Sequence, residues 1–299
     1  MALELDHPIG FIGLGVMGTP MANHLHRAGA KLVVHNRTPE KTERFLKEFA
    51  GSRSANSLAE VVRDVSGGAV ITMLTNTPAF ETVMLGKGGI VEAIEPGTLV
   101  IDMSTTGLAK TREVAAILRE RGCGYVDAPV SGGEVGAKEA VLSIMAGGEP
   151  EDFERAKPIF EVLGRQIAHL GPVGSGQICK LANQTIVGIT VAAVAEALIL
   201  AEKAGVDPSA VRDAIRGGFA ESRILAEHGE RMVTGNFEPG GKSAYQLKDV
   251  REAREVAREA GIELPMLFRN VELWEAMVEE WGGEAVDHSG IFRMYQETL

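Results

Sequence analysis

The chain has 299 residues, of which 45% are hydrophobic and 24% charged, a composition typical of soluble globular proteins. Its length predicts about two domains. The formal net charge is -11 and no basic cluster interrupts the sequence, which argues against nucleic acid or an acidic membrane surface as a partner.

Cysteine usage and hydropathy predict a compartment. Cys123 and Cys179 have neither metal-site spacing nor a disulfide framework, which fits a reducing cytosol. The N-terminal letters MALELDHP lack the basic region of a signal peptide. The longest uncharged stretch of the most apolar run, Leu181 to Ala195, is shorter than the ~20 residues of a membrane span. We expect a cytoplasmic protein without a membrane segment, and no metal site.

The first half alternates short β-rich runs with helical runs. Strands are predicted at 8–12, 31–35, 69–74, 98–102 and 124–127, with two more at 142–146 and 166–170. Thr38-Pro39 predicts a helix start with proline in the first turn, and Ser57–Glu60 matches a capping box. This alternation predicts an α/β fold, a Rossmann-type, mainly parallel sheet with helices on both faces.

After the glycine-rich stretch Gly171–Gly176, only helical patterns follow. They cover about 177–204, 208–216, 221–233, 244–260, 265–281 and a C-terminal tail. We therefore predict a nucleotide-binding domain over 1–170 and an all-helical substrate and oligomerisation domain over 171–299, joined by one long helix. That helix is too apolar for an ordinary surface helix, so we expect a second subunit to cover part of it, in a homodimer or homotetramer.

Three glycines predict a dinucleotide site. Gly13, Gly15 and Gly18 form a G-x-G-x-x-G pattern between a predicted strand and a predicted helix, the context that this motif requires. The first permits a tight turn, the second a close approach of the pyrophosphate, and the third close helix–strand packing. Val16 and Met17 lie at the predicted helix N-terminus, where the pyrophosphate would rest.

The end of the second predicted strand indicates which dinucleotide binds. Asn36, Arg37 and Thr38 stand where NAD-binding proteins usually carry Asp or Glu. A guanidinium can bind a phosphate through two hydrogen bonds. We therefore predict NADP in preference to NAD; the alternative is that Arg37 is a solvated loop charge.

Two later strand ends carry further candidates for the cofactor site. Leu74, Thr75 and Asn76 follow one strand, and Thr105 follows the next. Ligands of open α/β sheets bind at the carboxyl ends of the strands. These hydroxyl and amide groups are therefore suited to the ribose or nicotinamide side of the cofactor.

Two segments predict the chemical site. Ser131-Gly132-Gly133 follows a strand end and exposes successive backbone N–H groups, which suit a carboxylate; a flexible turn is the alternative. Lys180, Asn183 and Gln184 share one face near the start of the long apolar helix. Hydride transfer to a carbonyl leaves an alkoxide, which needs a proton and a nearby positive charge. Lys180 can supply both.

These residues resemble the β-hydroxyacid dehydrogenase family, which includes 3-hydroxyisobutyrate and 6-phosphogluconate dehydrogenases. The resemblance rests on FIGLGVMGTPMANHL from Phe11, DAPVSGG from Asp127, GPVGSGQICKLANQ from Gly171 and LKDV from Leu247. It implies Lys180 as the acid/base and a substrate carboxylate on the Ser131-Gly132-Gly133 loop. It also implies cofactor contacts at Thr105 and Lys248. Imine reductases share this fold but usually replace the lysine.

Within the family, the sequence is most similar to the tartronate semialdehyde reductase branch. The matching stretches are KLANQ, AEKAGVDP, AIRGGFAESRIL and DHSGIFRMYQ. This implies reduction of a small aldehyde acid to glycerate. Asn183 is the first choice for orienting the substrate, with Gln184 as the alternative. The same chemistry on 3-hydroxyisobutyrate or succinic semialdehyde stays open, as does a non-catalytic NADP-binding module.

Overall fold

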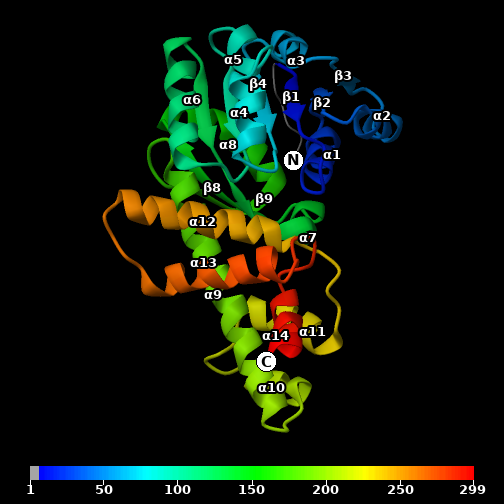
Figure 1. Cartoon of the computed structure of the whole chain (residues 1–299). Coiled ribbons are helices and arrows are strands. Elements are labelled where there is room, and N and C mark those ends of the chain that lie inside the picture. Colours follow the sequence, from blue (N-terminus) through cyan, green and yellow to red (C-terminus); the bar gives the residue numbers. More distant parts are fainter. Residues whose placement is uncertain (1–6) are drawn as a thin grey trace. The chain divides into compact units, whose positions relative to one another are not determined.

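A computed structural model describes residues 7–299; the expectation for the N-terminal letters falls mainly on residues 1–6, outside this range. Two compact units divide the chain, Met1–Lys180 and Leu181–Leu299 (Figure 1). This division falls inside the long helix α9 (Ser175–Lys203), whereas the sequence suggested a boundary in the loop before it.

The first unit is built on a nine-stranded sheet in the order β3-β2-β1-β4-β5-β6-β8-β7, with β9 paired to β8. The strands are β1 (Ile9–Ile12), β2 (Leu32–His35), β3 (Arg53–Ser54), β4 (Ala69–Thr72), β5 (Leu99–Asp102), β6 (Gly124–Asp127), β7 (Val130–Ser131), β8 (Leu142–Gly148) and β9 (Gly164–His169). Neighbours from β3 through to β6 are parallel, while β8 runs antiparallel to β6 and β7. The predicted fold class is confirmed. The two-residue strands β3 and β7 were not predicted, because they are too short to show an alternating pattern.

Alternate strand residues pack into two separate cores on the two faces of this sheet. Phe11 and Ile101 belong to one core, together with side chains of α1 (Gly18–Arg27), α2 (Pro39–Glu48) and α8 (Pro150–Leu163). Ile12 and Val100 belong to the other core. It contains side chains of α3 (Leu58–Asp64), α4 (Thr77–Leu85), α5 (Ile90–Ala93) and α6 (Leu108–Glu120).

The strand register brings the carboxyl ends of five strands to one edge. Ile12 pairs with His35 and Thr72, Thr72 with Asp102, and Asp102 with Asp127. The chain leaves β1 toward β2 on one side and returns to β4 on the other, so the order reverses beside β1. Ligands of open α/β sheets bind at such a reversal.

Two of the predicted helix starts show different cap chemistry. Ser57 Oγ accepts the N–H of Glu60 at 3.2 Å, as a capping box predicts. The Glu60 carboxylate, however, accepts the N–H of Asn56 rather than that of Ser57. Thr38 precedes Pro39 at the start of α2 but makes no side-chain cap hydrogen bond.

The second unit is helical. After its part of α9 come α10 (Pro208–Ile215), α11 (Arg223–Thr234), α12 (Ser243–Glu259), α13 (Pro265–Glu275), a π-helical turn η1 (Ala276–Glu280) and α14 (Gly290–Thr298). Trp274, Val271 and Met277 are fully buried, and they belong to one core with residues of α9, α12 and α14.

Helix α9 is, by length and composition, the one helix among residues 7–299 that could cross a membrane. The sequence argument counted only the uncharged residues between Lys180 and Glu196, whereas an 18-residue window that allows up to two charged residues meets the length and composition of a span. Of that 18-residue window, 44% is buried inside the chain. Its residues Val191, Ala195 and Leu198 are in the core of the second unit, as in the core helix of a soluble protein.

Two buried aspartates form the edge of the sheet beneath the loops. Asp102 Oδ1 accepts hydrogen bonds from Thr72 Oγ1 (2.8 Å) and the Ser104 N–H (3.2 Å), and Oδ2 accepts one from Thr106 Oγ1 (3.1 Å). Burial raises the pKa of Asp102 to about 6. Its carboxyl group therefore binds a proton more tightly in the folded than in the unfolded chain.

Asp127 holds the start of α9. Its Oδ1 accepts the N–H of Gly174 (2.7 Å) and its Oδ2 accepts the N–H of Gln177 (2.9 Å). Burial raises its pKa to about 7. Gln177 Nε2 in turn donates to Ser104 O (2.9 Å), and Gln177 Oε1 accepts the Thr106 N–H (3.2 Å). The loop after β5 and the start of α9 are thus joined by buried hydrogen bonds.

We predict that Asp102→Asn raises stability at neutral pH. The amide can keep the bonds from Thr72 and Ser104 and donate to Thr106, while the buried charge is removed. Because the pKa of Asp102 is higher in the folded than in the unfolded chain, the protonated carboxyl group favours the folded state at low pH. This contribution to the free energy of unfolding is lost as pH rises from about 4 to about 6. Urea unfolding of both proteins should give nearly equal stability at about pH 4 and below, and a variant advantage of up to roughly 3 kcal/mol at pH 8.

Asp127→Asn is the matched control, and it should do the opposite. Both Asp127 oxygens accept backbone N–H groups, so an amide must turn its NH₂ toward one of them. A buried unsatisfied donor costs roughly 1–3 kcal/mol. Equal stabilisation by both substitutions would contradict the hydrogen-bond assignment.

Candidate active site

The glycine turn between β1 and α1 has the shape of a dinucleotide site. Gly13 has a φ of +104°, and a Cβ there would collide with the carbonyl oxygen of Met73. A Cβ on Gly18 would collide with the carbonyl oxygen of Gly13, whereas one on Gly15 would meet no atom within 4 Å. The turn is therefore closed behind Gly13 and Gly18 and open at Gly15, which fits a pyrophosphate approaching from that side. Val16 is exposed and Met17 half-buried beside it.

Asn36 connects the end of β2 to this turn. Its Oδ1 accepts the N–H of Leu14 at 2.9 Å, and its Nδ2 donates to Thr38 O at 3.0 Å. The amide is thus occupied in shaping the turn. Arg37 and Thr38, which follow it in the chain, are exposed.

The loops after β4 and β5 are tied to each other. The N–H of Leu74 donates to Ser104 Oγ at 2.8 Å, and the N–H of Gly107 donates to Thr77 Oγ1 at 2.8 Å. Asn76 caps α4, because its Oδ1 accepts the N–H of Ala79 at 3.0 Å. Thr75 is exposed and Thr105 half-buried at the same edge of the sheet.

The Ser131-Gly132-Gly133 loop leaves the sheet at β7. Ser131 pairs with Ser143 of β8, and the short helix α7 (Gly133–Lys138) follows directly. Gly132 and Gly133 both have positive φ, +136° and +63°. A Cβ on Gly132 would meet Leu142 Cδ2 at 3.2 Å, whereas one on Gly133 would meet no atom within 4 Å, so the backbone of the loop is open at Gly133.

Lys180 is the sixth residue of α9 and only 7% exposed. Lysine side chains are seldom buried to this extent. The position of Lys180 near the start of the helix and its burial make it a candidate for a chemical role.

The second unit brings together three more of the predicted residues. Asn183 Nδ2 donates to Gln184 Oε1 at 2.8 Å, and Gln184 Nε2 donates to Asp249 Oδ2 at 2.7 Å. Asp249 Oδ1 lies 2.9 Å from Lys248 Nζ. Asn183, Gln184 and Lys248 are therefore linked through Asp249.

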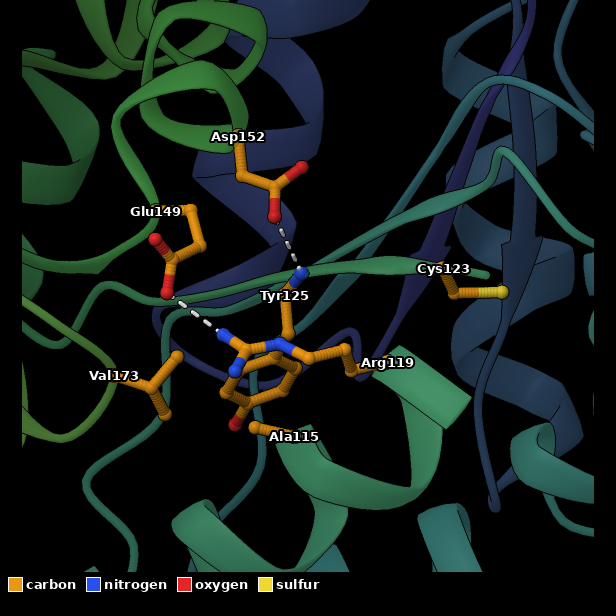
Figure 2. A pocket seen from close by; sticks show the side chains of 7 residues that line it. All are labelled: Ala115, Arg119, Cys123, Tyr125, Glu149, Asp152 and Val173. Carbon is orange, nitrogen blue, oxygen red and sulfur yellow. Dashed lines mark hydrogen bonds and ion pairs between the residues drawn. The ribbon is translucent and has the colours of Figure 1, made fainter. Parts of the chain in front are cut away.

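A small cavity in the first unit is separate from these residues. Figure 2 shows its lining side chains, in which Arg119 contacts Glu149 and the Tyr125 N–H donates to Asp152. Its volume of about 20 Å³ accommodates roughly one water molecule. None of the predicted site residues lines it, and it cannot hold a dinucleotide or a hydroxy acid.

Sequence reasoning missed several polar residues that hold the predicted ones. They are Asp102, Ser104, Asp127, Gln177, Gln246 and Asp249. The position of Asp102 and Asp127, each a carboxylate at the end of an apolar strand, can be read from the sequence, but their hydrogen-bond partners cannot. Among residues 7–299, no group of three or more His, Cys, Asp or Glu side chains forms a metal site.

Comparison with known proteins gives concordant matches over the whole length. Residues 8–171 match the NAD binding domain of 6-phosphogluconate dehydrogenase. Residues 174–295 match the family described as NAD-binding of NADP-dependent 3-hydroxyisobutyrate dehydrogenase.

Individual proteins agree with these matches. The 2-hydroxy-3-oxopropionate reductase of Escherichia coli (strain K12) is 43% identical over 283 residues, 95% of each chain. The 2-(hydroxymethyl)glutarate dehydrogenase of Eubacterium barkeri is 32% identical over 301 residues, 99% of this chain and 97% of that one. The crystal structure of Mycobacterium tuberculosis 3-hydroxyisobutyrate dehydrogenase with L-serine has a TM-score of 0.87 at 29% identity, covering 98% of this chain and 100% of that one. With a dinucleotide-shaped glycine turn in the first unit and relatives matched along nearly their full length, the chain belongs to the family of NAD(P)-dependent β-hydroxyacid dehydrogenases and is an oxidoreductase.

Proposed function

We propose that this enzyme reduces tartronate semialdehyde (2-hydroxy-3-oxopropanoate) to glycerate, with NADPH favoured and Lys180 as the general acid/base. The observation that carries the proposal is the buried Lys180 near the head of α9, since lysine side chains are seldom buried to this extent. The 43% identity to 2-hydroxy-3-oxopropionate reductase supports this substrate.

In this mechanism the residues of the chain bind and orient the substrate and protonate its carbonyl oxygen. The bound nicotinamide supplies the hydride. The N–H groups of the Ser131-Gly132-Gly133 loop hold the substrate carboxylate. Lys180 donates a proton to the carbonyl oxygen as negative charge develops there, and its second contribution is electrostatic stabilisation of that charge. In the reverse direction, Lys180 accepts the proton of the alcohol.

Two other substrates of the same chemistry remain as alternatives, 3-hydroxyisobutyrate and succinic semialdehyde. The structural relative named 3-hydroxyisobutyrate dehydrogenase favours the first of these. Rates of nicotinamide reduction with glycerate, 3-hydroxyisobutyrate and 4-hydroxybutyrate, each with NADP and with NAD, would rank them. A non-catalytic nucleotide-binding module is disfavoured, because the family consists of oxidoreductases.

The cofactor contacts belong to the same proposal. The glycine turn holds the pyrophosphate, Arg37 binds the 2′-phosphate of NADP, and the Leu74–Asn76 segment, Thr105 and Lys248 contact the ribose or nicotinamide side. The open space at Gly15 and the exposed Arg37 guanidinium support this arrangement.

Replacing Lys180 by Met should lower kcat by about 10²–10⁴, because the proton donor is lost. NADPH affinity, measured by quenching of protein fluorescence, should be retained. Lys203→Met is the control, since this exposed lysine ends the same helix and should keep full turnover. Unchanged kcat in Lys180→Met would refute the assigned role.

Arg37→Ala should weaken NADPH binding about 10–100-fold and leave NADH binding nearly unchanged, because only NADP carries the 2′-phosphate. Titration calorimetry with both nucleotides measures the ratio. Arg27→Ala removes the same charge at the far end of α1 and should alter neither affinity. An unchanged NADPH affinity in the Arg37 variant would mean that the guanidinium is a solvated loop charge.

We also infer a homo-oligomer assembled through α9. Apolar residues at helical spacing remain exposed on one stripe of this helix: Ala182, Ile186, Ala193, Ala197 and Leu200. Ile186 and Leu200 are 67% and 71% exposed, and a second copy would remove this apolar surface from water. Ile186→Asp should shift sedimentation toward the monomer at micromolar concentration, whereas Glu230→Asp, an exposed change on α11, should not. A wild type that sediments only as monomer would contradict the inference.

A further inference from the structure

A continuous line of polar side chains crosses from α12 to α9 within the second unit. Asp249 is 5% exposed, Gln184 is 9% exposed and Gln246 is fully buried. Gln184 Nε2 donates to both Asp249 Oδ2 (2.7 Å) and Gln246 Oε1 (3.1 Å). Gln246 Nε2 donates to the main-chain oxygen of Gln184 at 2.8 Å. The side-chain amide of Gln246 therefore bonds both the side chain and the main chain of Gln184.

The carboxylate at one end determines the direction of every amide in this line. A carboxylate only accepts hydrogen bonds, so the Gln184 amide must turn its Nε2 toward Asp249. The Gln184 Oε1 atom then faces Asn183 and can only accept a hydrogen bond. Asn183 Nδ2 donates that bond at 2.8 Å. Both Nε2 hydrogens of Gln184 are thereby engaged, while Asn183 is only half-buried.

We propose that Gln184, held by Asp249, is a positioning residue that fixes the Asn183 amide so that Asn183 recognises an α-hydroxy aldehyde. This rests on the proposed function and decides between the two amides that the sequence offered. One Nδ2 hydrogen of Asn183 serves Gln184. The other Nδ2 hydrogen and the acceptor Oδ1 then face the substrate together.

The substrate that matches this pair carries neighbouring oxygen atoms of different kinds. The Nδ2 hydrogen donates to the aldehyde oxygen, and Oδ1 accepts the hydroxyl hydrogen on the adjacent carbon. A substrate with a methyl group or a hydrogen atom at that carbon leaves Oδ1 unpaired. Sites that hydrogen-bond a substrate hydroxyl discriminate strongly against analogues that lack it, because a polar group of the site is then unsatisfied.

The test compares oxidation of glycerate with that of 3-hydroxypropionate, which lacks only the 2-hydroxyl and is smaller, so that steric exclusion plays no part. Wild-type enzyme should favour glycerate by about 100-fold or more in kcat/KM. Gln184→Met, similar in length but without the amide, should reduce this ratio at least about tenfold, mainly through a higher KM for glycerate. Activity on 3-hydroxypropionate should fall much less than activity on glycerate, because that substrate can lose only the contact between Asn183 Nδ2 and the reacting oxygen.

Asn270→Leu is the matched control. It removes another buried amide of the second unit, one that accepts a hydrogen bond from Trp274, and leaves Asp249, Gln184 and Asn183 unchanged, so the ratio should stay at the wild-type value. Equal losses of discrimination in both variants would overturn the positioning role. Melting temperature and NADPH binding report whether each variant folds.

Asn183→Leu tests the other end of the line and does not depend on Gln184→Met folding. It should also abolish the preference for glycerate; a retained preference would overturn the inference. An active wild-type enzyme with unchanged discrimination in Gln184→Met refutes this inference alone. A wild type that turns over neither acid refutes it together with the proposed function.

Discussion

The contact on which the site depends is the one between the Asp127 carboxylate and the first N–H groups of α9. A helix start leaves its N–H groups without partners, and here a buried carboxylate at the end of β6 accepts two of the N–H groups at and just before it. The approach is so close that a Cβ on Gly176 would collide with the main-chain oxygens of Asp127 and Met145. This fixes the start of α9 on the sheet edge, and Lys180 lies one turn further along.

A second consequence of this contact is electrostatic. Two carboxyl groups, of Asp102 and Asp127, are fully buried side by side at the ends of β5 and β6, and burial raises the pKa of each to about 6 and about 7. Hydrophobic replacements would avoid this cost, so the polar groups must be retained for what they hold. They order the loop around Ser104 and Thr106 through direct hydrogen bonds and through Gln177.

The sequence was sufficient to predict those features that depend only on residues close together in the chain. Five parallel strands, the glycine turn and the run of helices in the second half follow from periodicity and turn chemistry, and the structure has them within a few residues. The two-residue strands β3 and β7 carry no period to detect. The supporting polar residues were missed for a different reason: Asp127 meets Gly174 47 positions later, and Gln184 meets Asp249 65 positions later. Such pairs become visible only when the elements are packed.

The same limit explains why the sequence could name Asn183 only as the first choice for orienting the substrate and kept Gln184 as the alternative. Both are amides on one face of α9, and helical spacing alone cannot separate them. A hydrogen-bond acceptor elsewhere in the fold separates them, since Asp249 requires a donor and Gln184 supplies it. Asn36 shows the same logic in the first unit: its amide is used by Leu14 and Thr38, whereas the neighbouring Arg37 is exposed. In both places the amide is occupied within the protein, and the neighbouring residue is the one that we propose to meet the ligand.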